Sequence, residues 1–282
     1  MDWIDSQYVK RLRLNYPDVF RLADNVLNFA WGLTKGGIPY AEDNRINAWR
    51  FWNVGFAVAA FRLFRAAHIL VDAGLTREAQ LPARALLELL ANQAYMAGDP
   101  QERATDFLHQ ANASKKRLAV HLHHYGLADD EASAKLSRNL MEEQKALSEQ
   151  VGSPTDAYVS IRPFGKTAKN RISDAGLSWH YDLFYGAASD VAHMSAVAVD
   201  ALMDWNAEKG ALDLKGGPDN DGAGVLTVAT EIMLRIFYKT DEALELKKQA
   251  EIDNLVKEYW LIHKKKGLTL ETLIENFRGA GS

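Results

Sequence analysis

Four residues with reactive or hydrogen-bonding side chains recur at intervals of four: Tyr181, Tyr185, Ser189 and His193. Residues four apart share one face of a helix, so this spacing predicts a row of two phenols, a hydroxyl and an imidazole. Such groups suit general acid–base chemistry, but also a packed helix interface with hydrogen-bonded polar groups. Their small neighbours would let a helix or a ligand approach closely: Gly186, Ala187, Ala188, Ala192 and Ala196.

The segment that precedes this row is basic. Residues 158–171 hold no acidic residue and four cations: Arg162, Lys166, Lys169 and Arg171. Together with Tyr181, these cations would bind a phosphate or a carboxylate, because guanidinium groups pair with such anions through two parallel hydrogen bonds. The segment is not a P-loop, since Ser160 stands where the first glycine is required. RNA or another anionic ligand is the partner that this pattern favours.

A second polar row lies on an otherwise apolar helical stretch between residues 80 and 95. Its members are again four apart: Gln80, Arg84, Glu88 and Asn92. A narrow polar line of this kind is either the solvent-facing edge of a helix or a polar seam inside a bundle. Burial of charge is costly unless it is paired, and Arg84 and Glu88 are spaced to pair with each other. Both alternatives stay open.

The two rows together resemble an uncharacterised bacterial all-helical family, known only as a domain of unknown function. The resemblance rests on Asp72-Ala-Gly-Leu75, Glu78-Ala79 and Arg84-Ala-Leu-Leu-Glu88, followed by Gly176-Leu177, the four-residue row and His193-Met-Ser195. It covers about residues 51–203. It implies that the signature positions of the family are Arg84, Glu88, Tyr185, Ser189 and His193. A looser likeness links such proteins to HEPN-type helical domains, which include ribonucleases of bacterial toxin and defence systems.

HEPN-type ribonucleases carry an arginine followed, after four to six residues, by a histidine. Four pairs match where about one is expected by chance: Arg62/His68, Arg103/His109, Arg117/His123 and Arg117/His124. None has the usual polar residue after the arginine, and none lies on the Tyr185 stretch. A variant chemistry would use His193 as acid or base, Tyr185 and Ser189 as hydrogen-bonding groups, and Arg84 or a loop cation on the phosphate.

A metal site is a further alternative, because helical bundles can hold metals between acid-x-x-His pairs. The chain has two such pairs, Asp106/His109 and Asp190/His193, where about one is expected by chance. Both use the shorter aspartate, and Glu88 is the only obvious additional carboxylate. We therefore expect neither a metal nor any other cofactor.

Composition limits the classes of function. The absence of cysteine excludes disulfides, thiolate metal sites and a cysteine nucleophile. A net charge of −4 argues against a surface built wholly for nucleic acid. The N-terminus lacks the layout of a signal peptide. The most apolar stretch, Val54 to Leu70, is interrupted by charged residues and is not expected to cross a membrane. We expect a cytoplasmic protein.

Helical periodicity dominates the chain, and alternating strand patterns are scarce. We predict an all-α multi-helix bundle with one main domain over residues 1–282, a signature core at 51–203, and the segments 129–151 and 224–282 packed on it or projecting from it. The predicted helices are 8–33 with a fresh start at Pro17, 44–72, 76–96 capped by Thr76, 100–125, 129–151, 177–208, 224–263 with a break near Lys239, and 270–277. Residues 152–171 are predicted to be irregular.

Two classes of function remain. The first is an enzyme acting on RNA or another phosphate-bearing substrate, in bacterial defence or stress. The second is a non-catalytic helical binding or scaffold module, with amphipathic helices that would allow a homo-oligomer. An open pocket at the two polar rows would favour a ligand site, whereas a closed hydrogen-bonded seam would favour packing.

Overall fold

The structure is a computed structural model. It describes residues 6–35, 48–126, 166–195, 203–206, 210–214, 222–264 and 269–278, with scattered positions between 131 and 146 and at 200 and 208. The helices before the site are α1 (Ser6–Asn15), α2 (Pro17–Lys35), α3 (Ala48–Asp72), α4 (Thr76–Ala97) and α5 (Pro100–His124). The later helices are α7 (Ala168–Asp174), α8 (Ser178–His180), α9 (Gly186–His193), α11 (Gly222–Leu244), α12 (Gln249–Ile262) and α13 (Leu270–Arg278).

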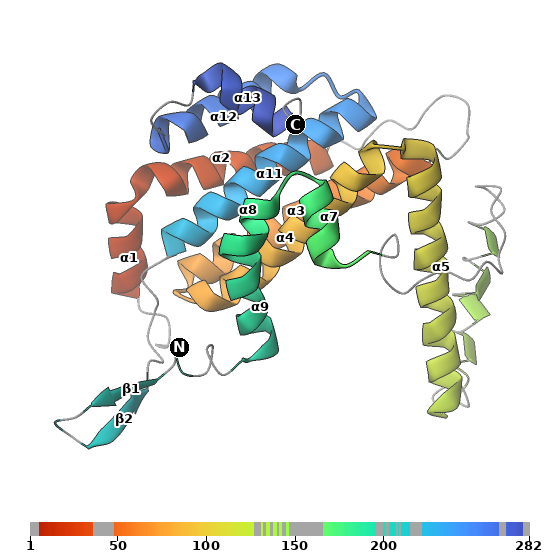
Figure 1. The fold of residues 1–282 in the computed structure, drawn as a ribbon, viewed down its shortest axis with the longest axis horizontal. Helices are drawn as coiled ribbons and strands as arrows, with labels where there is room; N and C mark the ends of the chain where they lie inside the picture. The colour runs from red at the N-terminus through yellow and green to blue at the C-terminus, as the bar shows by residue number, and fades with distance from the viewer. Residues whose placement is uncertain are drawn as a thin grey trace.

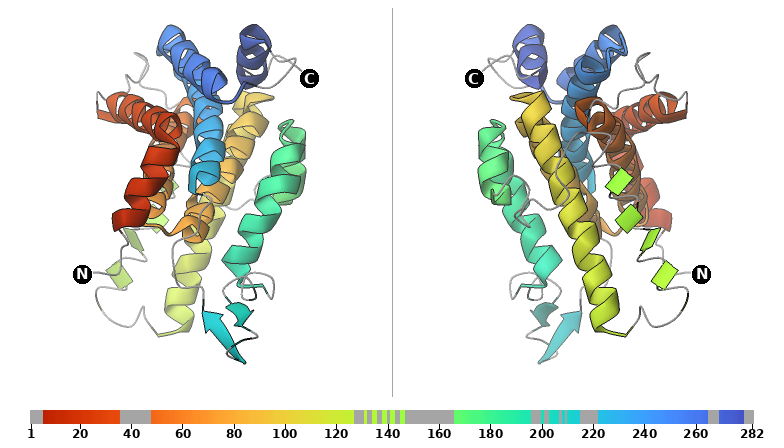
Figure 2. Two further views of the ribbon diagram at one scale, coloured as in Figure 1. Left: turned by 90° about the vertical axis from the view of Figure 1, so that its left-hand side faces the viewer. Right: turned by 90° about the vertical axis from the view of Figure 1, so that its right-hand side faces the viewer.

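The helices pack in layers, and the all-α prediction is confirmed. Helices α3, α4 and α11 form the centre, with α1 and α2 on one side and α7 to α9 on the other (Figures 1 and 2). Helices α12 and α13 lie against α2 and α11 (Figure 1). Strands β1 (Met203–Asn206) and β2 (Ala211–Leu214) form an antiparallel hairpin at the lower edge of the bundle in Figure 1.

A buried hydrogen-bonded group lies among the apolar side chains at the centre of the bundle. The Gln93 amide of α4 donates to Asn53 Oδ1 of α3 at 2.7 Å and to Thr240 Oγ1 of α11 at 3.1 Å. Three central helices are thereby joined through polar atoms that water does not reach. Helix α3 is long and apolar enough to cross a membrane by length and composition alone, contrary to the expectation for residues 54–70, but it packs here between α4 and α11.

The sequence Asp-Ala-Gly-Leu occurs twice and ends a helix each time. Gly74 after α3 and Gly176 after α7 both have positive φ, at 77° and 71°. The following leucine donates its N–H back to Leu70 O and Ile172 O respectively. These are Schellman caps, in which glycine takes the left-handed conformation that other residues disfavour. The second cap fixes the point from which the chain enters the site helix.

The predicted continuous helix 177–208 is interrupted after His193. Met194 is left-handed with φ 48°, and the Ser195 N–H donates to Asp190 O at 3.0 Å. Together they cap the C-terminus of α9, with methionine at the position that glycine usually occupies. The sequence carries no signal for this stop, since a methionine rarely takes this conformation. Residues 203–206 are strand rather than helix.

Three smaller boundaries also differ from the sequence predictions. Thr76 is the first residue of α4 rather than its cap, and the helix continues through Pro82. Residues 168–171, predicted to be irregular, begin α7 behind a Thr167 cap. The break predicted near Lys239 lies at 245–248, where Glu245 has φ 55° and the Lys248 N–H bonds to Asp241 Oδ1. Prediction of the 129–151 helix falls largely outside the described residues.

Candidate functional site

The helix that carries the first polar row is not a uniform α-helix. Between α8 and α9 it winds as a π-helix, η2 (Tyr181–Tyr185), in which hydrogen bonds join residues five apart; such segments often occur at functional sites. The rings of Tyr181 and Tyr185 stack with centroids 4.9 Å apart and 17° between their planes. The wider turn changes which side chains share a face with Tyr185.

The face of α9 that meets α4 is small and apolar. Ala188 is fully buried, Tyr185 is 7% exposed and Ala192 faces a pocket beside α4. Ser189 is partly buried, and His193 is exposed. The small residues therefore allow the predicted close approach, but to a helix. Tyr185 is the only member of the Tyr185/Ser189/His193 row that the structure brings to Arg84 and Glu88.

Arg84, Glu88 and Tyr185 form a closed triangle of hydrogen bonds. Arg84 Nη2 donates to Tyr185 Oη at 3.0 Å, and Tyr185 Oη donates to Glu88 Oε1 at 2.8 Å. Arg84 Nε donates to the same Glu88 oxygen at 3.3 Å. The guanidinium also lies over the Tyr185 ring, 4.5 Å from its centroid. Burial raises the pKa of Tyr185, and its bond to Glu88 adds to this, so the phenol is neutral at physiological pH.

Arg171 lies behind Glu88 and completes what we call the Arg84 cluster: Arg84, Glu88, Arg171 and Tyr185. Its Nη2 is 3.9 Å from Glu88 Oε2, and its Nη1 donates to Lys166 O at 2.7 Å. The residue is 4% exposed, and its Nε has no hydrogen-bond partner among the described residues. Burial lowers the pKa of Arg171, while Glu88 and Tyr185 oppose that shift. The sequence predicted Arg171 as an open ligand contact, whereas it is buried.

Two stacked tyrosine rings, with a cation at each end, run outward from the cluster. Arg84 covers Tyr185, Tyr185 stacks on Tyr181, and Lys169 Nζ lies 5.7 Å from the Tyr181 centroid. Cations over aromatic faces are attracted by the ring quadrupole. Lys169, predicted to bind a ligand, is exposed at the outer end of this stack.

Of the other two predicted cations, Lys166 does not reach the cluster with its side chain. Lys166 pairs with Asp174 at 2.7 Å and lies over the Tyr95 ring. Arg162 lies outside the described residues. The positive charge of the basic segment is therefore partly neutralised within the protein. Arg171 is the described cation of this segment that lies next to Glu88.

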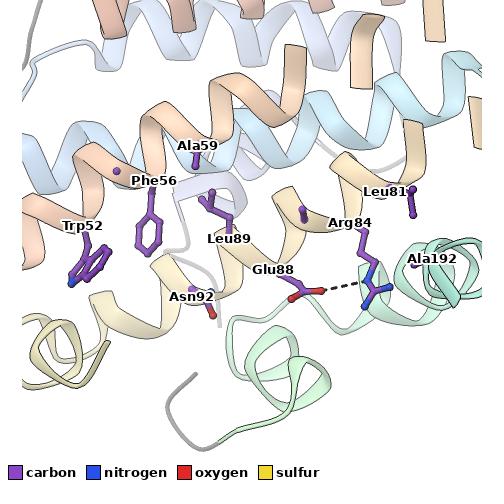
Figure 3. Close-up of a pocket in the computed structure, with 11 residues that line it drawn as sticks. Trp52, Phe56, Ala59, Leu81, Arg84, Glu88, Leu89, Asn92 and Ala192 are labelled. Atoms are coloured by element: carbon purple, nitrogen blue, oxygen red, sulfur yellow. Dashed lines mark hydrogen bonds and ion pairs between the residues drawn. The ribbon is translucent and has the colours of Figure 1, made fainter. Parts of the chain in front are cut away.

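A pocket of about 620 Å³ opens beside the Arg84 cluster between α3, α4 and α9. Its polar groups are Arg84, Glu88 and Asn92, which follow one line along α4 (Figure 3). The remaining lining is apolar or small: Trp52, Gly55, Phe56, Ala59, Leu81, Ala85, Leu89 and Ala192. Arg84 and Glu88 of the second polar row thus bond to Tyr185 across the helix interface and, together with Asn92, also line the pocket.

Sequence reasoning missed the α3 side of this pocket. Trp52, Gly55, Phe56 and Ala59 carry no charge and read as core positions of an apolar helix. A glycine inside such a helix was the one available signal, because glycine there costs helix stability and often marks a close approach or open space.

Residues 51–211 match a family of unknown function, DUF5677. The chain belongs to the DUF5677 family. No protein of curated function and no solved structure matches it. The matched range holds α4 to α9 and hence the whole Arg84 cluster, while α11 to α13 lie beyond it. The predicted resemblance to an uncharacterised helical family is confirmed; the HEPN likeness and the bacterial origin stay predictions.

Of the predicted ribonuclease pairs, only Arg62/His68 has both side chains within the described part of this DUF5677 structure. Arg62 is exposed while His68 is buried between Asp24 and Asp72, so the two do not converge. Arg103 is engaged with Tyr95. The side chains of His109, Arg117 and His123 lie outside the described residues. Within the described part of the chain, no three His, Asp or Glu side chains are grouped so that they could hold a metal ion.

Replacement of Tyr185 with phenylalanine should lower the free energy of unfolding by about 1–3 kcal/mol, because the Arg84 and Glu88 groups would lose a shared partner. Chemical denaturation would measure the change. Tyr181→Phe is the matched control, since its hydroxyl makes no hydrogen bond within the described part of the chain and its ring stack would persist. Equal stability of the wild type and Tyr185→Phe would show that the triangle contributes nothing.

Proposed function

We propose that this DUF5677 protein is a non-catalytic helical binding protein whose pocket between α3, α4 and α9 takes a small organic molecule. The observation that carries the proposal is the pocket itself. Its volume of about 620 Å³ lies in the range of ligand sites. Apolar walls with a few polar groups on one side are the usual lining of such sites, since the walls supply burial and the polar groups orient the ligand.

Binding is better supported than catalysis. A general acid or base must reach the reacting atoms, and His193 is exposed and not among the residues that line the pocket. Tyr185 is held neutral by its raised pKa, and Glu88 already accepts two hydrogen bonds. The ribonuclease hypothesis would need His193 and a phosphate-binding cation at one place. Its direct test remains cleavage of cellular RNA by the wild type and by His193→Ala, with loss in the variant as the supporting result.

Gly55 offers a way to fill the pocket without disturbing the fold. A Cβ at this position would meet nothing within 4 Å, and Gly55 lines the pocket. A leucine there should extend into the space that a ligand would use. It should also stabilise α3 by roughly 0.5–1 kcal/mol, because glycine is a poor residue inside a helix. Gly32 in α2 is the matched control, since its Cβ also meets open space and it lies outside the pocket.

The test is a fluorescence titration with N-phenyl-1-naphthylamine, a neutral probe that brightens in apolar sites. The wild type and Gly32→Leu should bind one probe with equal affinity, and Gly55→Leu should bind at least tenfold more weakly while its melting temperature does not fall. Equal binding by all three proteins, or binding by none, would overturn the proposal.

A further inference from the structure

The Arg84 cluster contains more buried positive charge than negative charge. Two guanidinium groups share one carboxylate, and the side chains of Arg84 and Arg171 are only 17% and 5% exposed. Tyr185 is neutral and adds no negative charge. Lys166 does not change this balance, because Asp174 neutralises it. An uncompensated buried charge is costly, so the cluster is set to gain from an anion.

Arg84 has donors left for such an anion. Its Nε and Nη2 are engaged with Glu88 and Tyr185, and its Nη1 makes no hydrogen bond to any described residue. The guanidinium lines the pocket, next to Glu88 and close to Ala192 (Figure 3). A carboxylate or phosphate in the pocket could therefore accept from Arg84 without breaking the triangle.

Asn92 carries an unmet hydrogen-bonding group at the other end of the polar row, and the residue lines the pocket. Its Oδ1 is buried and has no hydrogen-bond partner in the described part of the chain, so the side-chain amide must turn before a ligand in the pocket can reach this oxygen. Asn92 and Arg84 are eight residues apart on α4, which corresponds to about 12 Å at the helical rise. Between them, Phe56 and Leu89 form an apolar wall (Figure 3).

We propose that the ligand is an elongated organic anion. Its carboxylate or phosphate lies at Arg84, its apolar body lies against Phe56 and Leu89, and a hydroxyl or amino group about 12 Å away donates to Asn92 Oδ1. This inference rests on the proposed function, because it names the ligand class of the same pocket. Arg171 acts through Glu88: it holds that carboxylate from behind and leaves Arg84 able to bind an external anion.

The ligand class is tested by displacement of N-phenyl-1-naphthylamine with four straight-chain probes: 1-decanol, decanoate, decyl phosphate and 10-hydroxydecanoate. We expect decanoate or decyl phosphate to bind at least tenfold more tightly than 1-decanol, and the stronger of the two identifies the head group. We expect 10-hydroxydecanoate to bind several-fold more tightly than decanoate, and Asn92→Leu to reverse that order. If 1-decanol displaces the probe as well as both anions do, the anion inference fails although the pocket is confirmed. If the probe itself does not bind, the proposed function fails.

Two substitutions should change the preference for an anion in opposite directions. Arg84→Met should reduce the ratio of decanoate to 1-decanol affinity about tenfold, because it removes the one cation among the described residues that line the pocket. Glu88→Gln should raise the ratio several-fold, because it removes the competing carboxylate and keeps acceptors for Arg84 and Tyr185. A merely structural cluster would give the same direction in both variants, and that result would overturn the inference.

Discussion

Replacement of Glu231 with alanine is expected to lower the free energy of unfolding by about 3–5 kcal/mol, the usual cost of removing one partner from a buried ion pair. Glu231 is 7% exposed and joins three helices. Its Oε1 lies 2.9 Å from Arg235 Nη2 and 3.3 Å from His180 Nε2, and its Oε2 accepts from Tyr259 Oη at 3.1 Å. Without the carboxylate, Arg235 would keep a buried charge and the other two groups would lose an acceptor.

Chemical denaturation at neutral pH measures this loss. Glu251→Ala is the matched control, because Glu251 is exposed and pairs with Lys248 on the surface, where such pairs contribute at most about 1 kcal/mol. Glu231→Gln keeps hydrogen-bonding atoms without the charge and should lie between the wild type and the alanine variant, which covers the case in which Glu231→Ala does not fold. A loss below about 1 kcal/mol for both Glu231 variants would contradict the role given to this residue.

Lowering the pH from about 4.5 to about 2 should lower the free energy of unfolding by an amount comparable to the loss expected for Glu231→Ala. Burial raises the pKa of Glu231 and of Asp72, but their basic partners outweigh this and bring each pKa to about 2. For Glu231 the partners are His180 and Arg235; for Asp72 they are His68 and Arg13, whose guanidinium donates to both carboxylate oxygens at 2.9 and 2.7 Å.

The sign follows from the direction of these shifts. A pKa that is lower in the folded state than in the unfolded chain gives stability that is present above the unfolded value and is lost as the pH falls through the folded value. At 1.36 kcal/mol per pKa unit, each carboxylate contributes roughly 2–3 kcal/mol at neutral pH. Urea unfolding should therefore give a lower free energy of unfolding at pH 2.5 than at pH 5 for the wild type. For Asp72→Asn the difference between the two pH values should be smaller. The same difference in both proteins would exclude Asp72 as a source of acid sensitivity.

Only one residue of the first polar row, Tyr185, meets Arg84 and Glu88 of the second. The spacing of Arg84 and Glu88 follows helical periodicity and was sufficient to predict their pairing within α4, whereas their contact with Tyr185 depends on how the helices pack. Ser189 and His193 do not meet Arg84 and Glu88, because the π-helix at 181–185 changes the register of the row and Met194 ends the helix one residue after His193. Neither feature has a local sequence signal.

The pocket was hidden for a different reason. Its apolar wall consists of ordinary core residue types on α3. Trp52 and Phe56 also pack against Phe107 of α5, and only the tertiary arrangement places both residues at the edge of the pocket as well. Arg171 is the opposite case. A cation in a basic segment is expected on the surface, but Arg171 is buried and lies next to Glu88. Composition and spacing identify candidate groups, whereas burial decides which of them remain open to a ligand.

The most direct test of a ligand site between α3, α4 and α9 is the nuclear magnetic resonance signal of the Trp52 indole N–H. This group donates to Ala104 O at 3.1 Å, and Trp52 lines the pocket. The chain has seven tryptophans, and Trp52→Phe identifies the signal of Trp52. Addition of 10-hydroxydecanoate should shift that signal in a saturable manner and leave those of Trp31, Trp179 and Trp260 in place. An unchanged Trp52 signal at probe concentrations that displace N-phenyl-1-naphthylamine would contradict the site.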